Sequence, residues 1–231
     1  MMIREFQRQA HHYMRDLPEA DQYVDWLAIM QHYGAPTRLL DFTRSFYVAA
    51  FFAIEMTDRD CAIWAVNEEH LTNRVRDKYN IDQNMDYLSN NALRLKTANT
   101  TLQEKRPDPG VIHLEPFKQH ERLVVQQGLF IMPVAAHETF ETNLCAGLGL
   151  EPAVLSRPER TVFDGRDAPS IQLFPVPLVK IILRRKLHSE AMKDLARMNI
   201  NAASLFAGLD GFARSLNRPL RLFDALKQSM S

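Results

Sequence analysis

The chain has 231 residues, long enough to bury a hydrophobic core in one domain with a helical tail. Lysine plus arginine and aspartate plus glutamate number 28 each, so no net charge attracts nucleic acid or an anionic membrane. The N-terminus lacks the apolar stretch of a secretory signal, and the apolar run Val48–Ile54 is too short to cross a bilayer. Cys61 and Cys145 have no disulfide or zinc spacing, which predicts a reducing, cytoplasmic compartment and no metal site.

The first half of the chain predicts three helices. Residues 2–15 are charged and rich in helix formers, which indicates a surface helix. Apolar residues at spacings of three and four from Ala20 to Tyr33 predict an amphipathic helix, which Gly34 ends. Residues 46–55 are apolar on nearly every side and predict a buried helix, with Asp41 or Thr43 as its N-cap.

The strands are scattered among these helices. Apolar runs predict strands at 61–66, at 111–115 and, after a helical turn or strand entry, within 121–132. Residues 67–109 are polar and predict a mostly helical or irregular insertion, either a lid or an exposed surface excursion. Gly128 marks a tight bend or a close backbone approach.

The remaining part of the chain continues this mixture. We predict a helix at 137–145, a loop at 157–169, strands at 171–174 and 180–183, a helix capped by Ser189, and two short helices through Leu216. Strands without regular strand–helix alternation favour an α+β fold with a central mixed or antiparallel sheet and a helical C-terminal tail. The expected organisation is a surface helix (1–19), a domain (20–135, with 67–109 inserted), and strands and helices packed on that domain (136–231).

Phosphate-loop, dinucleotide, zinc-protease, serine-hydrolase and EF-hand motifs are absent from the sequence. The segment Gln31–Thr43, with the sequence QHYGAPTRLLDFT, instead places chemically capable side chains between two buried elements. Together with the following 49–53 (AAFFA) and the later 126–130 (QQGLF), it resembles the FRG domain family. The resemblance covers residues 20–135. The tripeptide for which the family is named, Phe or Tyr-Arg-Gly, is absent, so the sequence is expected to start after it.

This resemblance implies a bacterial protein of a family whose function is uncharacterised. In outline the family is similar to ADP-ribosyltransferase folds, in which an arginine or histidine of the first strand holds NAD. The resemblance therefore suggests a toxin or anti-phage defence effector that uses NAD as a substrate. Two other functions stay open: a non-catalytic module that binds or regulates a partner protein, and a nucleic-acid-processing factor, against which the neutral charge counts. A protein or a small nucleotide is the expected partner.

Arg38 is the leading candidate for ligand binding, because its planar guanidinium suits phosphate or carboxylate and the Thr37 hydroxyl lies beside it. The structural alternative is an ion pair between Arg38 and Asp41 that holds the loop. Asp41 is either a base that orients His32 or, as we favour, a helix cap. His32 at a helix C-terminus suits anion contact or acid catalysis, or else is a structural hydrogen-bonding group.

Three later residues complete the predicted site. The amides of Gln126 and Gln127 can recognise a base or a nicotinamide carboxamide, and Glu121 is the acid that can polarise a ribose hydroxyl. The alternative for Glu121 is a surface ion pair with Arg122, which would contribute little to stability. The predicted catalytic residues are thus His32, Arg38, Asp41 and Glu121, and the predicted NAD-binding residues are Thr37, Arg38, Gln126 and Gln127.

Overall fold

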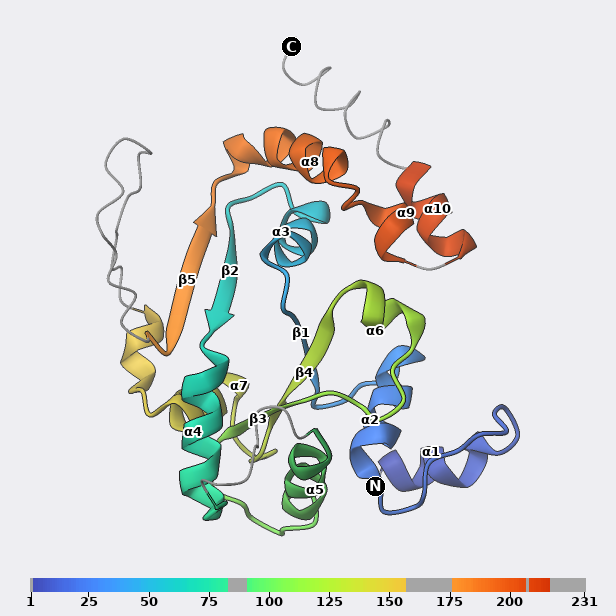
Figure 1. The fold of residues 1–231 in the computed structure, drawn as a ribbon, viewed down its shortest axis with the longest axis vertical. Coiled ribbons are helices and arrows are strands. Elements are labelled where there is room, and N and C mark those ends of the chain that lie inside the picture. Colours follow the sequence, from blue (N-terminus) through green and yellow to red (C-terminus); the bar gives the residue numbers. More distant parts are fainter. Residues whose placement is uncertain (1, 83–90, 157–175, 207, 217–231) are drawn as a thin grey trace. The chain divides into compact units, whose positions relative to one another are not determined.

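The computed structural model describes residues 2–82, 91–156, 176–206 and 208–216 (Figure 1). Its helices are α1 (Met2–Ala10), α2 (Tyr23–His32), α3 (Phe46–Glu55), α4 (Glu68–Tyr79), α5 (Asn91–Thr101), α6 (Glu121–Val125), α7 (Phe140–Leu148), α8 (His188–Arg197), α9 (Ala202–Leu205) and α10 (Leu209–Leu216), with short 3-10 helices η1 (Pro152–Ser156) and η2 (Arg185–Leu187). Its strands are β1 (Leu40–Thr43), β2 (Cys61–Val66), β3 (Val111–Leu114), β4 (Gly128–Pro133) and β5 (Leu178–Leu183). This combination confirms the predicted α+β class.

The described strands form two small sheets, ordered β1-β4-β3 and β2-β5. β3 and β4 are antiparallel, with Val111 opposite Pro133 and Leu114 opposite Phe130. Every residue of these two strands is buried. Because neither face meets water, the strands are nearly continuous apolar runs and do not alternate with polar residues. His113 is the exception in β3.

The chain divides into two compact units. The first unit consists of Met1–Asp41, Ala65–Lys118 and Phe130–Val179; the second consists of Phe42–Trp64, Gln119–Leu129 and Lys180–Ser231.

In the first unit, α4, α5 and α7 pack against β3 (Figure 1). Asn143 of α7 is fully buried and fixes the ends of β3 and β4. Its Oδ1 accepts hydrogen bonds from the amides of Gly110 and Ala135, at 3.2 and 2.9 Å. Its Nδ2 donates to the carbonyls of Ala135 and Thr139, at 3.0 and 2.9 Å. Both polar atoms of this buried amide are therefore satisfied, as burial requires.

The end of α2 follows directly from Gly34. This glycine has a left-handed φ of 80°, and its amide donates to the Gln31 carbonyl at 3.0 Å. The Ala35 amide reaches back to the Met30 carbonyl at 2.9 Å. This pair of bonds is a Schellman cap, which satisfies carbonyls left open by the last helical turn. The predicted glycine stop is confirmed.

Asp25, in the first turn of α2, connects that helix to the turn after β3. Its side chain is 8% exposed, and Oδ1 accepts a hydrogen bond from the Phe117 amide at 2.9 Å. Burial raises the pKa of the Asp25 carboxyl above its ordinary value of 3.8, although bonds from backbone amides oppose the shift. The folded state therefore holds the Asp25 proton more tightly than the unfolded chain does.

Substituting Asp25→Asn should remove one source of pH dependence from the stability of the protein. The stabilisation from the protonated carboxyl is fully present below the unfolded pKa and is lost as pH rises through the raised folded pKa. Because asparagine keeps an oxygen for the Phe117 amide, the variant should gain stability relative to the parent as pH rises through this window. Denaturant unfolding of both proteins from pH 4 to 7 measures the difference, and a difference that stays constant with pH would contradict this expectation.

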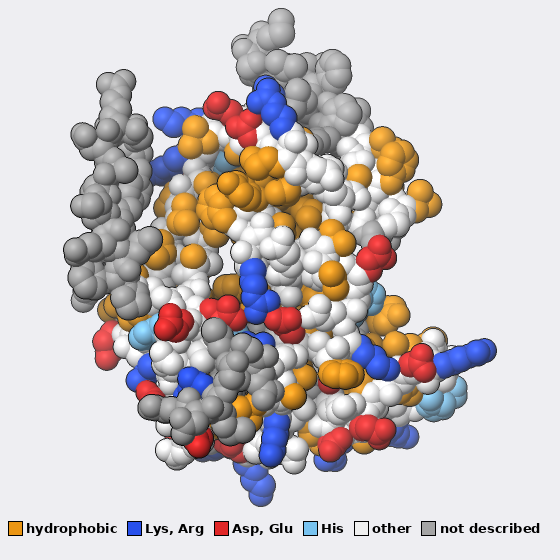
Figure 2. All heavy atoms as spheres, viewed as in Figure 1, with side chains coloured by type: hydrophobic (Ala, Val, Ile, Leu, Met, Phe, Trp, Pro, Cys, Tyr) orange, Lys and Arg blue, Asp and Glu red, His pale blue; other side chains and the backbone are white. Residues whose placement is uncertain are grey.

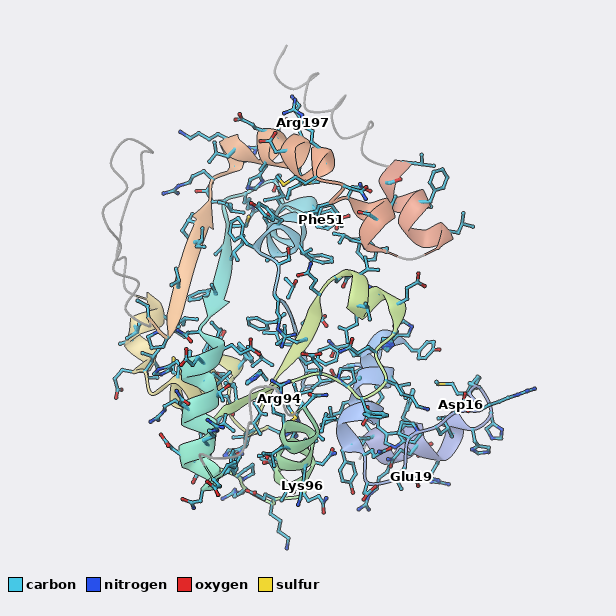
Figure 3. The ribbon with its side chains drawn as sticks, viewed as in Figure 1. Asp16, Glu19, Phe51, Arg94, Lys96 and Arg197 are labelled. Atoms are coloured by element: carbon cyan, nitrogen blue, oxygen red, sulfur yellow. The ribbon has the colours of Figure 1, made fainter. Side chains whose placement is uncertain are left out.

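The core of the second unit forms between α3, β2, α8 and α9. Its buried residues include Val48, Phe51 and Ile54 of α3, with Ile63 of β2 and Leu195 of α8. Figure 3 marks Phe51, which is 1% exposed. α3 also lies beside α8 (Figure 1). The predicted buried helix at 46–55 and the predicted strand at 61–66 therefore share one core.

Phe206, which follows α9, is a second centre of packing in this unit. The guanidinium groups of Arg122 and Arg214 lie 4.5 and 4.2 Å from the centroid of its ring. Arg214 also donates two hydrogen bonds to the Glu55 carboxylate, at 2.8 and 2.7 Å. The bidentate pair neutralises Arg214 and joins α10 to the end of α3.

Several predicted helix boundaries were wrong. The N-cap of α3 is Ser45, whose hydroxyl accepts from the Val48 amide, and neither Asp41 nor Thr43 takes that role. α1 ends at Ala10 and α7 begins at Phe140, capped by Thr139. α8 begins at His188, so Ser189 lies inside the helix. Boundaries depend on single hydrogen bonds that periodicity does not detect.

The predicted loop at 157–169 and strand at 171–174 lie outside the described residues. Among the described helices, none combines the length and the apolar character needed to cross a membrane.

Candidate functional site

Three side chains from the end of α2, the turn after it and β1 form a chain of hydrogen bonds. The Thr37 hydroxyl donates to Oε1 of Gln31, and Nε2 of Gln31 donates to Oδ1 of Asp41 at 2.9 Å. The Thr37 oxygen also accepts from the Leu39 amide at 3.2 Å. These bonds connect the last turn of α2 to β1 and fix the intervening loop. They also occupy the hydroxyl of Thr37, which was predicted to contact a ligand.

Arg38 is positioned by this loop and is half-buried. Its Nη1 donates to the Val134 carbonyl at 3.2 Å. Burial lowers the pKa of the Arg38 guanidinium from its ordinary value, yet an arginine remains charged at any physiological pH. The predicted ion pair with Asp41 is wrong, since the Asp41 carboxylate accepts from Gln31 and forms no ion pair with Arg38.

The charge of Arg38 is therefore not neutralised by any acidic side chain in the described part of the chain. A guanidinium carries five N–H donors, and one of them binds Val134. Partial burial strengthens the attraction between the remaining donors and an anion, because less water screens the charge. This arrangement suits phosphate or carboxylate.

His32 ends α2 and is exposed, with its ring 4.9 Å from the ring of Tyr33 in an edge-on arrangement. Asp41 is also exposed and lies in β1, so the loop predicted for this segment gives way to a strand at Leu40. The first unit thus brings together Gln31, Thr37 and Asp41 through hydrogen bonds.

The other predicted residues belong to the second unit. The Thr43 hydroxyl donates to the Gln126 carbonyl at 2.7 Å, and the Arg44 amide donates to the Gln127 carbonyl at 3.0 Å. The Gln31–Thr43 block and the 126–130 block are therefore in contact through Thr43 and Gln126, and Arg44, the residue after the first block, continues this contact at Gln127. Gln127 has a left-handed φ of 48°, which lets the chain turn sharply into β4.

The side chains of these later residues are placed differently from one another. Gln126 donates its amide to the Leu205 carbonyl at 2.9 Å, so this amide has a structural partner. Gln127 and Glu121 are exposed. Arg122 lies over the Phe206 ring, and the predicted ion pair between Glu121 and Arg122 is wrong. Gly128 is confirmed as a close approach, because a Cβ atom there would lie 2.5 Å from Leu123 Cδ1.

The sequence did not predict a cluster of charged side chains around a buried arginine in the first unit. Arg94 of α5 and His113 of β3 are 3% and 2% exposed, and Nη1 of Arg94 lies 2.9 Å from Nε2 of His113. Glu68 lies 3.8 Å from Arg94 and 3.4 Å from His113, and Glu115 lies 4.0 Å from Arg94. Figure 3 shows Arg94 where α5 meets β3 and α4.

This cluster joins α4, α5 and β3 by charge. The signal available in the sequence was the single histidine within the apolar strand Val111–Leu114. Arg94 and Glu68, the partners of His113, belong to the 67–109 segment that was interpreted as a polar insertion. The spacing of these residues in the sequence does not predict that they meet. No group of three potential metal ligands occurs among the residues that the structure describes.

Comparison with known proteins adds one finding. No curated protein and no solved structure matches this chain. One family model matches the first part of the chain. The matched residues include the whole turn after α2, with Arg38, and α3, whereas the later block at 126–130 lies beyond them. The resemblance predicted from the Gln31–Thr43 segment is confirmed, since residues 1–61 of this chain match the FRG domain.

Proposed function

We propose that the protein binds NAD through Arg38 and transfers ADP-ribose from it to an acceptor. One observation carries the proposal: the half-buried guanidinium of Arg38 is held by the Val134 carbonyl and faces no neutralising acid among the described residues. A partly buried charge that no internal acid neutralises favours an external partner of opposite sign. The pyrophosphate of NAD supplies that charge, and arginine recognises phosphate oxygens through paired N–H donors.

In the proposed reaction, the bond between C1′ of the nicotinamide ribose and the nicotinamide nitrogen breaks. Nicotinamide leaves with the electron pair, and a nucleophile of the acceptor bonds to C1′ and loses its proton. Arg38 holds the diphosphate and so orients the ribose. The role of His32 as an acid is a further prediction, open to a separate substitution. The roles predicted from sequence for Glu121 and Gln127, which belong to the second unit, stay separate predictions.

The substitution Arg38→Gln tests the proposal directly. Removing the guanidinium should weaken NAD binding by about 10- to 100-fold, the usual range for a lost charge-assisted hydrogen bond. The free energy of unfolding should fall by only about 1–2 kcal/mol, because one bond to a backbone carbonyl is lost. Calorimetric titration with NAD, nicotinamide release and thermal melting measure the three quantities together.

Arg59→Gln is the matched control, since the Arg59 side chain is 90% exposed and its ion pair is with the exposed Asp58. It should leave binding and melting unchanged. Two results count against the proposal: no NAD binding by the intact protein at millimolar concentration, or unchanged binding by Arg38→Gln. A large loss of stability without loss of binding would instead assign Arg38 a structural role.

A second candidate function, a non-catalytic module that binds a partner protein, is favoured by the surface of α3. Three aromatic side chains of this helix and a methionine just after it are 37–67% exposed: Phe46, Tyr47, Phe52 and Met56. Figure 2 shows apolar side chains gathered on the surface in this part of the second unit. Exposed apolar patches mark interaction surfaces. Absence of NAD binding together with a stably folded Arg38→Gln variant would favour this function.

A further inference from the structure

The first unit contains a cavity of about 420 Å³ between the start of α2 and one face of α5. The α5 side includes Leu95, Lys96 and Asn99, at the spacing of one helical face. Oδ1 of Asn99 accepts from the Val24 amide at 3.0 Å and so holds the two helices together. The cavity has the size of small-molecule sites. It contains none of the residues proposed to bind NAD.

Asp25 is the one strongly buried acid in the lining of this cavity. Its hydrogen bonds come from neutral backbone amides, with Oδ1 accepting from Phe117, and the nearby charge of Lys118 lowers the pKa of Asp25 less than burial raises it. A carboxylate removed from water is costly unless a cation compensates its charge, and Lys118 compensates this one only in part. Burial is also the main reason why the pKa of this carboxyl is raised. A cation entering the cavity would offset this cost.

The other residues that line the cavity also favour a cation. Asp21 adds a second carboxylate and Lys96 a single ammonium. When these side chains and Asp25 are ionised, the lining residues carry a net negative charge. Phe117 also lines it and is 77% exposed, which leaves a bare aromatic side chain. Aromatic faces attract cations, and they favour organic cations with apolar parts over hydrated metal ions. The amides of Gln22 and Gln103 supply neutral hydrogen-bonding groups.

We propose that this cavity binds a small organic cation, an alkylammonium or guanidinium group, with Asp25 as its counter-ion and Phe117 as its aromatic contact. Such a group occurs on free polyamines and amines and at the end of lysine or arginine side chains. The site is independent of Arg38, so it holds whether or not the protein binds NAD.

The experiment titrates the full chain by calorimetry with three probes: spermidine, agmatine, and a short unstructured peptide containing arginine. Comparing the affinity for the free amines with the affinity for the peptide distinguishes a small-molecule ligand from a lysine or arginine side chain. A urea analogue of agmatine, which has the same shape and no charge, should bind at least tenfold more weakly. Binding of the charged probes should shift the resonances of Asn99 and Phe117 in amide spectra.

Asp25→Asn keeps the oxygen that accepts from the Phe117 amide and removes the charge. It should weaken cation binding by about 10- to 100-fold. Phe117→Leu should weaken it by about 2- to 5-fold, and it keeps the backbone amide that Asp25 holds. Because Phe117 is exposed, this variant stays informative if Asp25→Asn folds poorly. Lys96→Met removes a like charge and should leave binding equal or tighter.

The proposal is overturned if the folded parent protein binds none of the charged probes at millimolar concentration. Equal affinity for agmatine and its urea analogue overturns it as well, and so does undiminished binding by Asp25→Asn. Arg38→Gln should bind the cations as the parent does, which keeps this result separate from the NAD experiment.

Discussion

Substituting Asn143→Ala should lower the free energy of unfolding by about 3–5 kcal/mol, the largest loss we expect from an uncharged side chain of this protein. The asparagine is 0% exposed and bonds to both ends of the β3–β4 pair. Alanine leaves the amides of Gly110 and Ala135 buried without their acceptor. It also opens a small cavity beneath α7, which adds to the loss. Denaturant unfolding monitored by circular dichroism measures the difference.

Two further variants make the measurement specific. Asn143→Asp should be at least as damaging at neutral pH, because a carboxylate cannot donate to the carbonyls of Ala135 and Thr139 and would be buried with its charge. Asn73→Ala, on the exposed side of α4, should change stability by less than about 0.5 kcal/mol. An Asn143→Ala variant as stable as the parent would show that water replaces the side chain without loss.

Gly211→Ala should also be severely destabilising, by about 3 kcal/mol, for a steric reason. A Cβ atom at this position would lie 1.9 Å from the Phe206 carbonyl oxygen and 2.9 Å from that of Ala202. Both are backbone atoms, so no side-chain rotation relieves the contact and α10 must move away from α9. That movement would disturb Phe206 and the arginines packed over it.

Gly208→Ala is the matched control, because the space around Gly208 is open and only its φ of 82° opposes a side chain. Its cost should be about 1 kcal/mol, the usual penalty for a left-handed alanine. Thermal melting and tryptophan or far-ultraviolet signals rank the two variants. Equal melting temperatures for Gly208→Ala and Gly211→Ala would contradict the close approach of α10 to Phe206.

The helices and strands that the sequence by itself determined are those that depend on residues close together in the chain. Apolar spacing between Ala20 and Tyr33 predicts α2, and Gly34 predicts its end. The apolar runs at β2, β3 and β4 likewise predict strands that the structure contains. Periodicity and turn chemistry act within a few residues, so one sequence suffices to detect them. The Gln31–Thr43 block was sufficient in the same way to predict the resemblance to the FRG domain, which residues 1–61 match.

The partners of the polar side chains were decided by the tertiary structure alone. The sequence offers Asp41, three residues away, as the structural partner of Arg38, yet Arg38 donates to Val134, 96 residues later in the chain. Asp41 was favoured as a helix cap, yet β1 begins one residue before it, and Ser45 caps α3. Arg94 and His113 gave no pattern until α5 packed on β3. A buried polar group must bond to whichever donor or acceptor the packed elements bring within about 3 Å, and the distance along the chain carries no information about that choice.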